Sequence, residues 1–102
     1  MLFRSDANDR LVEALLEATI KRHSLALAHA QAEGDIAPTV DTTQLARHLT
    51  AQAWGVVLLW MKGLLALRQV ERETTRAHLM TLISVTRGQC RERLEQSLGE
   101  MH

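Results

Sequence analysis

The stretch HLTAQAWGVVLLWM, residues 48–61, contains no Asp, Glu, Lys or Arg, and it constrains how the rest of the chain can fold. Its apolar residues recur at the spacing of a helix that has one side in a core. A surface helix normally carries charges on its opposite side. This helix has Ala51 and Gly55 there instead. The stretch therefore predicts a helix that other helices cover on both sides.

A second charge-free stretch, residues 77–86, predicts the same for the following helix. Between Ala77 and Gly88 small residues recur at spacings of four, three and four, which lets another helix approach closely. A chain of three helices is too small to cover these two helices on all sides. We therefore predict a symmetric dimer in which the second and third helices of each copy form a four-helix bundle. The alternative is that these uncharged positions are solvated. The predicted interface residues are Ala51, Gly55, Leu59, Ala77, Thr81, Ser84 and Gly88.

The first helix is expected to run from about Ser5 or Asn8 to Glu33. Gly34 then stands where a helix commonly ends in a left-handed residue. One face of this helix is apolar at helical spacing. The residues of this face are Leu11, Val12, Leu15, Leu16, Thr19 and Ile20.

The second helix has a clear start and end. Asp41, with Gln44 three residues later, is typical of a capping box, in which Asp41 accepts a hydrogen bond from the backbone three residues on. The helix should continue to Met61 or Lys62, with Gly63 as its end. The face expected in the core is formed by Leu45, Leu49, Ala53, Val56 and Trp60.

A third helix is expected to begin near Arg72, and Gly88 either ends it or is tolerated within it. Its apolar side is expected to carry Leu79, Leu82, Ile83 and Thr86. The tail of residues 88–102 is either a further helix or frayed, and Cys90, Leu94 and Leu98 could extend the apolar stripe. The predicted fold is therefore all-α, with three to four antiparallel helices.

Length and composition indicate one small domain over residues 1–102. Twelve Lys and Arg balance twelve Asp and Glu, which removes the basic excess of a nucleic-acid-binding protein. A single cysteine, Cys90, cannot form an internal disulfide and fits a reducing compartment. The longest apolar run, residues 53–61, is far shorter than the roughly 20 residues of a membrane span, and residues 1–6 lack a signal-peptide pattern. We expect a cytoplasmic protein with no membrane contact.

No motif in the chain points to catalysis or to a metal. Histidines stand at positions 23, 29, 48, 78 and 102, and none forms the His-x-x-x-His pair that places two ligands on one helix face. Neither a Gly-x-Ser-x-Gly turn nor a glycine-rich phosphate loop occurs. We therefore expect no enzyme activity and no metal or cofactor. A helical-bundle catalyst that uses His48 or His78 is the less favoured alternative.

Three residues are candidates for lining a pocket for a small apolar ligand, namely Thr50, Trp54 and Met61. Pockets for such ligands are mostly hydrophobic, with a few polar groups. The alternative for Trp54 is that it fills a junction between helices, whereas Trp60 is expected to lie in the core. Another polar stripe, formed by Gln44, His48 and Gln52, is either a hydrated helix edge or a set of hydrogen-bonding groups for a ligand or an interface.

One family pattern runs through these features. Its residues are Ala30-Gln31-Ala32-Glu33-Gly34-Asp35-Ile36, then Asp41, then Leu45-Ala46 opening a helix, then Gly55 with the apolar run to Trp60, and residues 75–87 as a last helix. In these residues the chain resembles the C-terminal half of TetR-family transcriptional regulators. The resemblance covers roughly residues 5–87, with the tail 88–102 outside it.

The resemblance implies an all-α domain of a bacterial repressor that forms a homodimer and binds a small, often apolar effector. In that family the effector changes the spacing of two N-terminal helix-turn-helix segments and releases DNA. Residues 5–33 read as one long helix, so this chain would contact DNA only through a segment that it does not contain. The alternative is a stand-alone helical homodimerisation or protein-interaction module that does not bind DNA.

Overall fold

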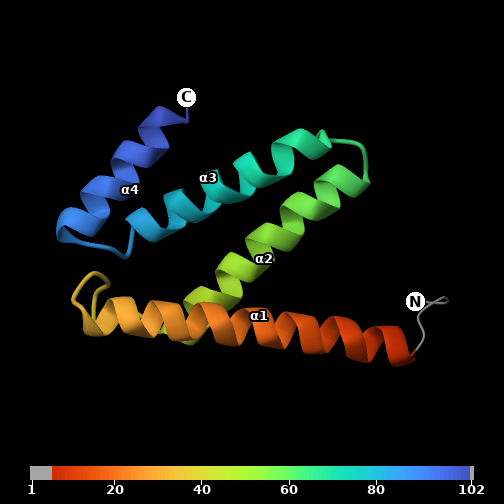
Figure 1. The fold of residues 1–102 in the computed structure, drawn as a ribbon, viewed down its shortest axis with the longest axis horizontal. Helices are drawn as coiled ribbons and strands as arrows, with labels where there is room; N and C mark the ends of the chain where they lie inside the picture. The colour runs from red at the N-terminus through yellow and green to blue at the C-terminus, as the bar shows by residue number, and fades with distance from the viewer. Residues whose placement is uncertain (1–5, 102) are drawn as a thin grey trace.

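The computed structural model describes residues 6–101, which form four α-helices and one short 3-10 turn, with no β-strand within that range (Figure 1). Successive helices alternate in direction along the chain. The all-α prediction is confirmed. The alternative helix start at Ser5 lies outside the described residues. The elements are α1 (Asp6–Ala32), α2 (Thr42–Met61), η1 (Leu67–Gln69), α3 (Val70–Ile83) and α4 (Gly88–Glu100).

α1 ends just before Gly34, as the position of this glycine in the sequence predicts. Gly34 has φ of +86°, in the left-handed region that glycine adopts without a steric penalty. The amide of Asp35 donates to the carbonyl of Ala30 at 2.9 Å, and the amide of Gly34 donates to the carbonyl of Gln31 at 3.1 Å. This pair of bonds satisfies the last carbonyls of the helix, as in a Schellman motif.

Both ends of α2 also follow the sequence. The side chain of Asp41 accepts from the amides of Thr43 at 3.0 Å and Gln44 at 3.1 Å, which confirms it as the N-cap. At the other end Gly63 has φ of +77°, and its amide donates to the carbonyl of Trp60 at 3.0 Å. The helix therefore stops after Met61, and η1 leads the chain back into α3.

The third helix ends earlier than expected, and the tail forms a helix of its own. α3 stops at Ile83, and Thr86 lies in the following turn rather than on a helix face, which corrects its predicted place in the apolar stripe. Thr86 instead forms an isolated antiparallel bridge with Ile36 in the α1–α2 loop. Backbone hydrogen bonds on either side of it join Ala37 to Val85 at 3.1 Å and residue 87 to residue 35 at 3.0 Å.

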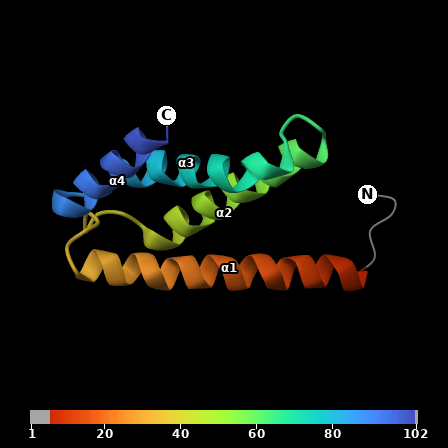
Figure 2. The same cartoon turned by 45° about the horizontal axis from the view of Figure 1, so that its top comes forward.

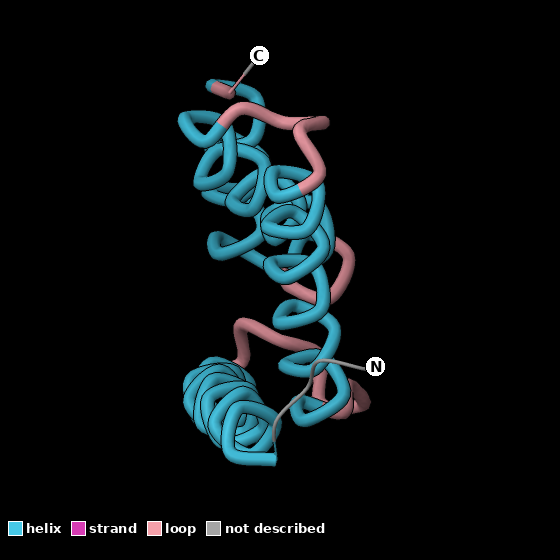
Figure 3. The backbone as a smooth tube through the Cα atoms, turned by 90° about the vertical axis from the view of Figure 1, so that its right-hand side faces the viewer, coloured by secondary structure: helices cyan, strands magenta, loops and turns pink. Residues whose placement is uncertain are grey.

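This loop contact joins the α1–α2 loop to the α3–α4 turn at one end of the molecule. Towards the other end α1 and α2 diverge, whereas α2 and α3 come together at the connection that contains η1 (Figure 1). α1 packs on α2, α2 on α3, and α3 on α4, so each helix meets its neighbour in sequence (Figures 1 and 2). The principal extents are 48 × 30 × 15 Å, and a helix with its side chains is about 10–12 Å across. The chain is therefore little more than one helix thick, as the side view also shows (Figure 3).

The core of this thin arrangement is small and lies near the α1–α2 loop. The most deeply placed large side chain is Ile36, which is 2% exposed. The predicted α2 face is buried at Leu45, Leu49 and Val56, which confirms that part of the pattern. Trp60, on the same face, is 39% exposed, so its predicted place in the core is wrong. It lies in the last turn of α2, at the end of that helix that has diverged from α1 (Figure 1).

Candidate self-association surface and ligand groove

The chain exposes more surface than a protein of its size usually does. Its accessible area is 7559 Å², whereas a compact monomer of 11.5 kDa has about 5,800 Å². The radius of gyration is 15.6 Å, against about 13 Å for a compact domain of this length. Many large apolar side chains contribute to this exposed surface. The exposed large apolar residues on α2, α3 and their connection are Trp54, Leu58, Leu59, Trp60, Met61, Leu64, Leu67 and Met80.

On α2, the three predicted interface residues form one exposed line. Ala51, Gly55 and Leu59 are spaced four residues apart, so they lie on one side of the helix, and all three are exposed. A Cβ atom added to Gly55 would meet nothing within 4 Å. Leu58, which is 55% exposed, borders this line. The line therefore leaves room for another helix to approach closely at Gly55.

On α3, the predicted interface residues divide between the outside and the inside of the chain. Ser84 is exposed, whereas Ala77 and Thr81 are half-buried. The hydroxyl of Thr81 accepts a hydrogen bond of 2.5 Å from the Nε2 of Gln52, so this side chain faces α2 of its own chain. Gly88 is exposed at the first position of α4 and does not belong to α3.

Met80 is the interface candidate that the sequence analysis missed. It is 57% exposed and lies three residues after Ala77 and four before Ser84, a spacing that places all three on one side of α3. The signal was present in this spacing, but a search for small residues passes over a methionine. Ala77, Met80 and Ser84 are defined here, with Ala51, Gly55 and Leu59, as the α2–α3 outer surface.

A groove of about 370 Å³ lies between α1 and α2, and it borders the α2–α3 outer surface at Ala51, which belongs to both. Its walls come from the part of α1 that approaches α2 and from the outer side of α2. Two of the three predicted ligand-pocket residues, Thr50 and Trp54, lie in it, whereas Met61 does not. The six residues that line it are Leu16, Ile20, Arg47, Thr50, Ala51 and Trp54.

The polar groups of this α1–α2 groove are few. The hydroxyl of Thr50, which is buried, donates to the carbonyl of Ala46 at 2.8 Å, so it has no hydrogen left to donate to a ligand. Trp54 is 48% exposed and offers both an apolar ring and an indole N–H. Arg47 is exposed, and within residues 6–101 it has neither an ion pair nor a side-chain hydrogen bond.

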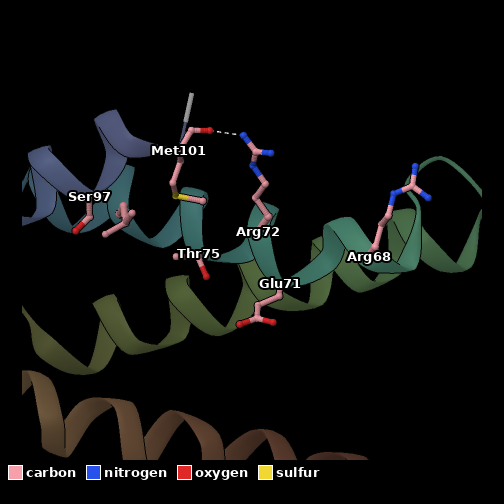
Figure 4. A pocket seen from close by; sticks show the side chains of 7 residues that line it. Arg68, Glu71, Arg72, Thr75, Ser97 and Met101 are labelled. Carbon is pink, nitrogen blue, oxygen red and sulfur yellow. Dashed lines mark hydrogen bonds between the residues drawn. The ribbon is translucent and has the colours of Figure 1, made fainter.

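A larger groove of about 520 Å³ lies between α3 and α4 (Figure 4). Its charged residues are Arg68, Glu71 and Arg72. Arg72 reaches across to α4 and donates to the carbonyl of Met101, while Glu71 points the opposite way. A cation near the last carbonyls of a helix is favourable, so Arg72 holds the end of α4 against α3.

Two histidines meet where α1 passes α3. The ring centroids of His23 and His78 are 6.5 Å apart, in an edge-to-face arrangement. The Nε2 atom of His78 lies 2.9 Å from the carbonyl oxygen of Leu49 in α2. The Nδ1 of His23 is buried and has no hydrogen-bond partner within the described chain. Burial lowers the pKa of His23, and the neighbouring His78 and Arg22 lower it further. Among residues 6–101, no third metal-ligating side chain joins this pair.

The remaining candidates from the sequence lie apart from these features. Gln44 and His48 are exposed along α2, while Gln52, the third residue of that stripe, is engaged with Thr81. Cys90 is half-buried in α4. None of the helices between residues 6 and 101 is both long and apolar enough to cross a membrane.

Comparisons of this chain with models of protein families, with curated proteins and with solved structures find no match.

Proposed function

We propose that this chain is the dimerisation and effector-binding domain of a TetR-like transcriptional repressor, and that two copies pair through the α2–α3 outer surface. The observation that carries the proposal is the row of exposed apolar and small side chains along α2 and α3. Contiguous exposed apolar patches are typical of association surfaces. The sequence resemblance supports the same assignment, because in that family the corresponding helices form the dimer.

The amount of exposed surface fits a permanent dimer. The accessible area exceeds that of a compact monomer by about 1,750 Å². Obligate dimers bury about 2,000–5,000 Å² in total, or about half of that on each copy. Pairing through α2 and α3 would also supply the second layer of helices that a stable domain needs.

Sedimentation velocity with matched variants tests the dimer. The wild-type chain is expected to sediment at about twice 11.5 kDa at tens of micromolar. Gly55→Leu should weaken the dimer, because the larger side chain occupies the space where the partner approaches, while its Cβ meets nothing within 4 Å in its own chain. Gly99→Leu on α4, where an added Cβ also meets nothing within 4 Å, is the matched control and should leave the dimer intact.

A second variant tests the α3 side. Ser84→Glu places an unpaired carboxylate in the surface, which a closed interface would bury at a cost of several kcal/mol. The substitution should convert the dimer to monomer, whereas Gln89→Glu at an exposed position of α4 should not. A wild-type chain that sediments as a monomer would overturn the dimer, and an intact Ser84→Glu dimer would overturn this placement of its surface.

The repressor part of the proposal is separable from the dimer. It requires a helix-turn-helix segment encoded directly upstream of residue 1. A continuous upstream reading frame with that pattern supports the repressor. An upstream region without one would instead favour the stand-alone homodimerisation module, which needs the same α2–α3 outer surface but not DNA.

A further inference from the structure

The groove between α1 and α2 has the size and the walls of a site for a small molecule. Its volume of about 370 Å³ is near the lower end of the 300–1,000 Å³ that small-molecule sites occupy. Leu16 and Ile20 line the α1 side, and Trp54 is the aromatic residue on the α2 side. Towards the first turns of α1 the two helices diverge (Figures 1 and 2).

The charge of the groove selects the polar part of its ligand. Arg47 is the single charged residue among the six that line it. Because the Thr50 hydroxyl already donates to Ala46, the side-chain donors left in the lining are Arg47 and the indole of Trp54. A lining with free donors and no carboxylate is complementary to an anionic acceptor. The planar guanidinium forms paired hydrogen bonds with a carboxylate.

We propose that the α1–α2 groove binds a small apolar carboxylic acid, whose carboxylate pairs with Arg47 and whose apolar body lies between Trp54 and the α1 side chains. The inference rests on the proposed function, since it names the chemical class of the effector. The groove between α3 and α4 is larger but does not make the same case. Its lining includes the carboxylate of Glu71, and Arg72 already binds the Met101 carbonyl.

The ligand class is tested by a pair of probes that differ only in charge, phenylbutyrate and its neutral amide phenylbutyramide. Binding is followed by tryptophan emission, with Trp54→Phe to identify the responding indole. The acid should change the emission of the wild-type chain but not that of Trp54→Phe, because Trp60 does not line the groove. The amide should bind roughly tenfold more weakly or worse, because it cannot form the charged pair.

Arg47→Gln should weaken binding of the acid by roughly tenfold and leave binding of the amide unchanged. Arg93→Gln, which removes the same charge from an exposed position of α4, should leave both unchanged. Circular dichroism of each variant checks that the helices are retained. Equal binding of acid and amide, acid binding that does not depend on Arg47, or no binding of the acid would each overturn the proposal.

Sedimentation of the same samples separates this inference from the proposed function. If the wild-type chain is a dimer and the acid does not bind, the ligand class is wrong and self-association stands. If the chain is a monomer and the acid binds through Arg47, the groove is assigned correctly and the dimer is wrong.

Discussion

The protonation state of one residue, His23, is expected to affect the stability of the folded chain. Its ring is packed against His78, and its buried Nδ1 has no partner within residues 6–101. Protonation would therefore place a second donor and a charge where nothing accepts them. Because burial lowers the pKa of His23 in the folded chain, the unfolded chain binds the proton more readily.

The free energy of unfolding is therefore expected to fall as the pH drops below about 6.5, the ordinary histidine pKa. The contribution of His23 is fully present above that value and is lost as the pH falls through the lowered pKa of the folded state. Urea denaturation from about pH 7.5 to about pH 5.5 measures the slope. His23→Gln should flatten it, while His48→Gln at an exposed position should not. An unchanged slope in His23→Gln would contradict this role.

Residues also show where sequence reasoning stops. The spacing of the α2 face predicts the burial of Leu45 and Leu49 but fails at Trp60. Periodicity gives the direction of a side chain from its helix, not whether a neighbouring helix extends far enough to cover it. Arg47 was missed for a different reason. A lone arginine on a helix is normally solvated, and only the approach of α1 makes it part of a groove.

Between elements, the contact of Ile36 with the turn after α3 joins the two halves of the chain. Ile36 is 2% exposed, and its bridge to Thr86 ties the α1–α2 loop to the α3–α4 turn. Ile36→Ala should lower the free energy of unfolding by about 2–5 kcal/mol, because it leaves a cavity in a small core. Leu25→Ala on α1, where the side chain is 64% exposed, is the control and should change it by less than about 0.5 kcal/mol. Equal effects in a urea titration would refute the central place of Ile36.

Two glycines offer opposite outcomes for the same substitution. Gly63 ends α2 with φ of +77°, so Gly63→Ala should cost about 1–2 kcal/mol. Gly99 lies inside α4, and an added Cβ there meets nothing within 4 Å. Gly99→Ala should therefore stabilise the chain by about 0.5–1 kcal/mol. The melting temperatures of the two variants at equal protein concentration should move in opposite directions, and a shift in the same direction would contradict the assigned cap.

Elements with local signals could be predicted, and those set by distant contacts could not. Asp41, Gly34 and Gly63 mark helix ends through bonds to their own neighbours, so α1 and α2 were predicted closely. The end of α3 at Ile83 has no comparable mark. It is accompanied by hydrogen bonds from the turn to residues 35 and 37, which are about fifty residues away in sequence. α4 therefore remained an open alternative rather than a prediction.

For the whole molecule, a dimer would make stability depend on concentration. If folding and pairing are coupled, the midpoint of thermal unfolding should rise as the protein concentration is raised. We expect this rise for the wild-type chain and its loss in Ser84→Glu, measured by circular dichroism over a hundredfold range of concentration. A midpoint independent of concentration in the wild-type chain would argue for a self-sufficient monomer.

At the scale of the whole molecule, the sequence predicts that α2 and α3 leave surface uncovered, but it does not predict every residue of that surface. Two charge-free stretches imply too few helices to cover α2 and α3, and the large accessible area of the folded chain agrees. Ala51, Gly55 and Leu59, the predicted interface residues of α2, are exposed in the single chain. The side chain of Thr81 faces inward, where its hydroxyl accepts a hydrogen bond from Gln52 of the same chain. Helix spacing alone does not reveal this pairing.

The Ile36–Thr86 bridge between the α1–α2 loop and the α3–α4 turn also fixes one end of the longest helix, α1. α1 has 27 residues, so it projects about 40 Å from the fastened end. If a molecule wedged beside Trp54 tilts α1 by about 5° about that pivot, the tip near Asp6 swings by about 3.5 Å, while the fastened end stays almost still. A small event in the groove thus becomes a displacement of atomic size wherever the beginning of α1 is attached.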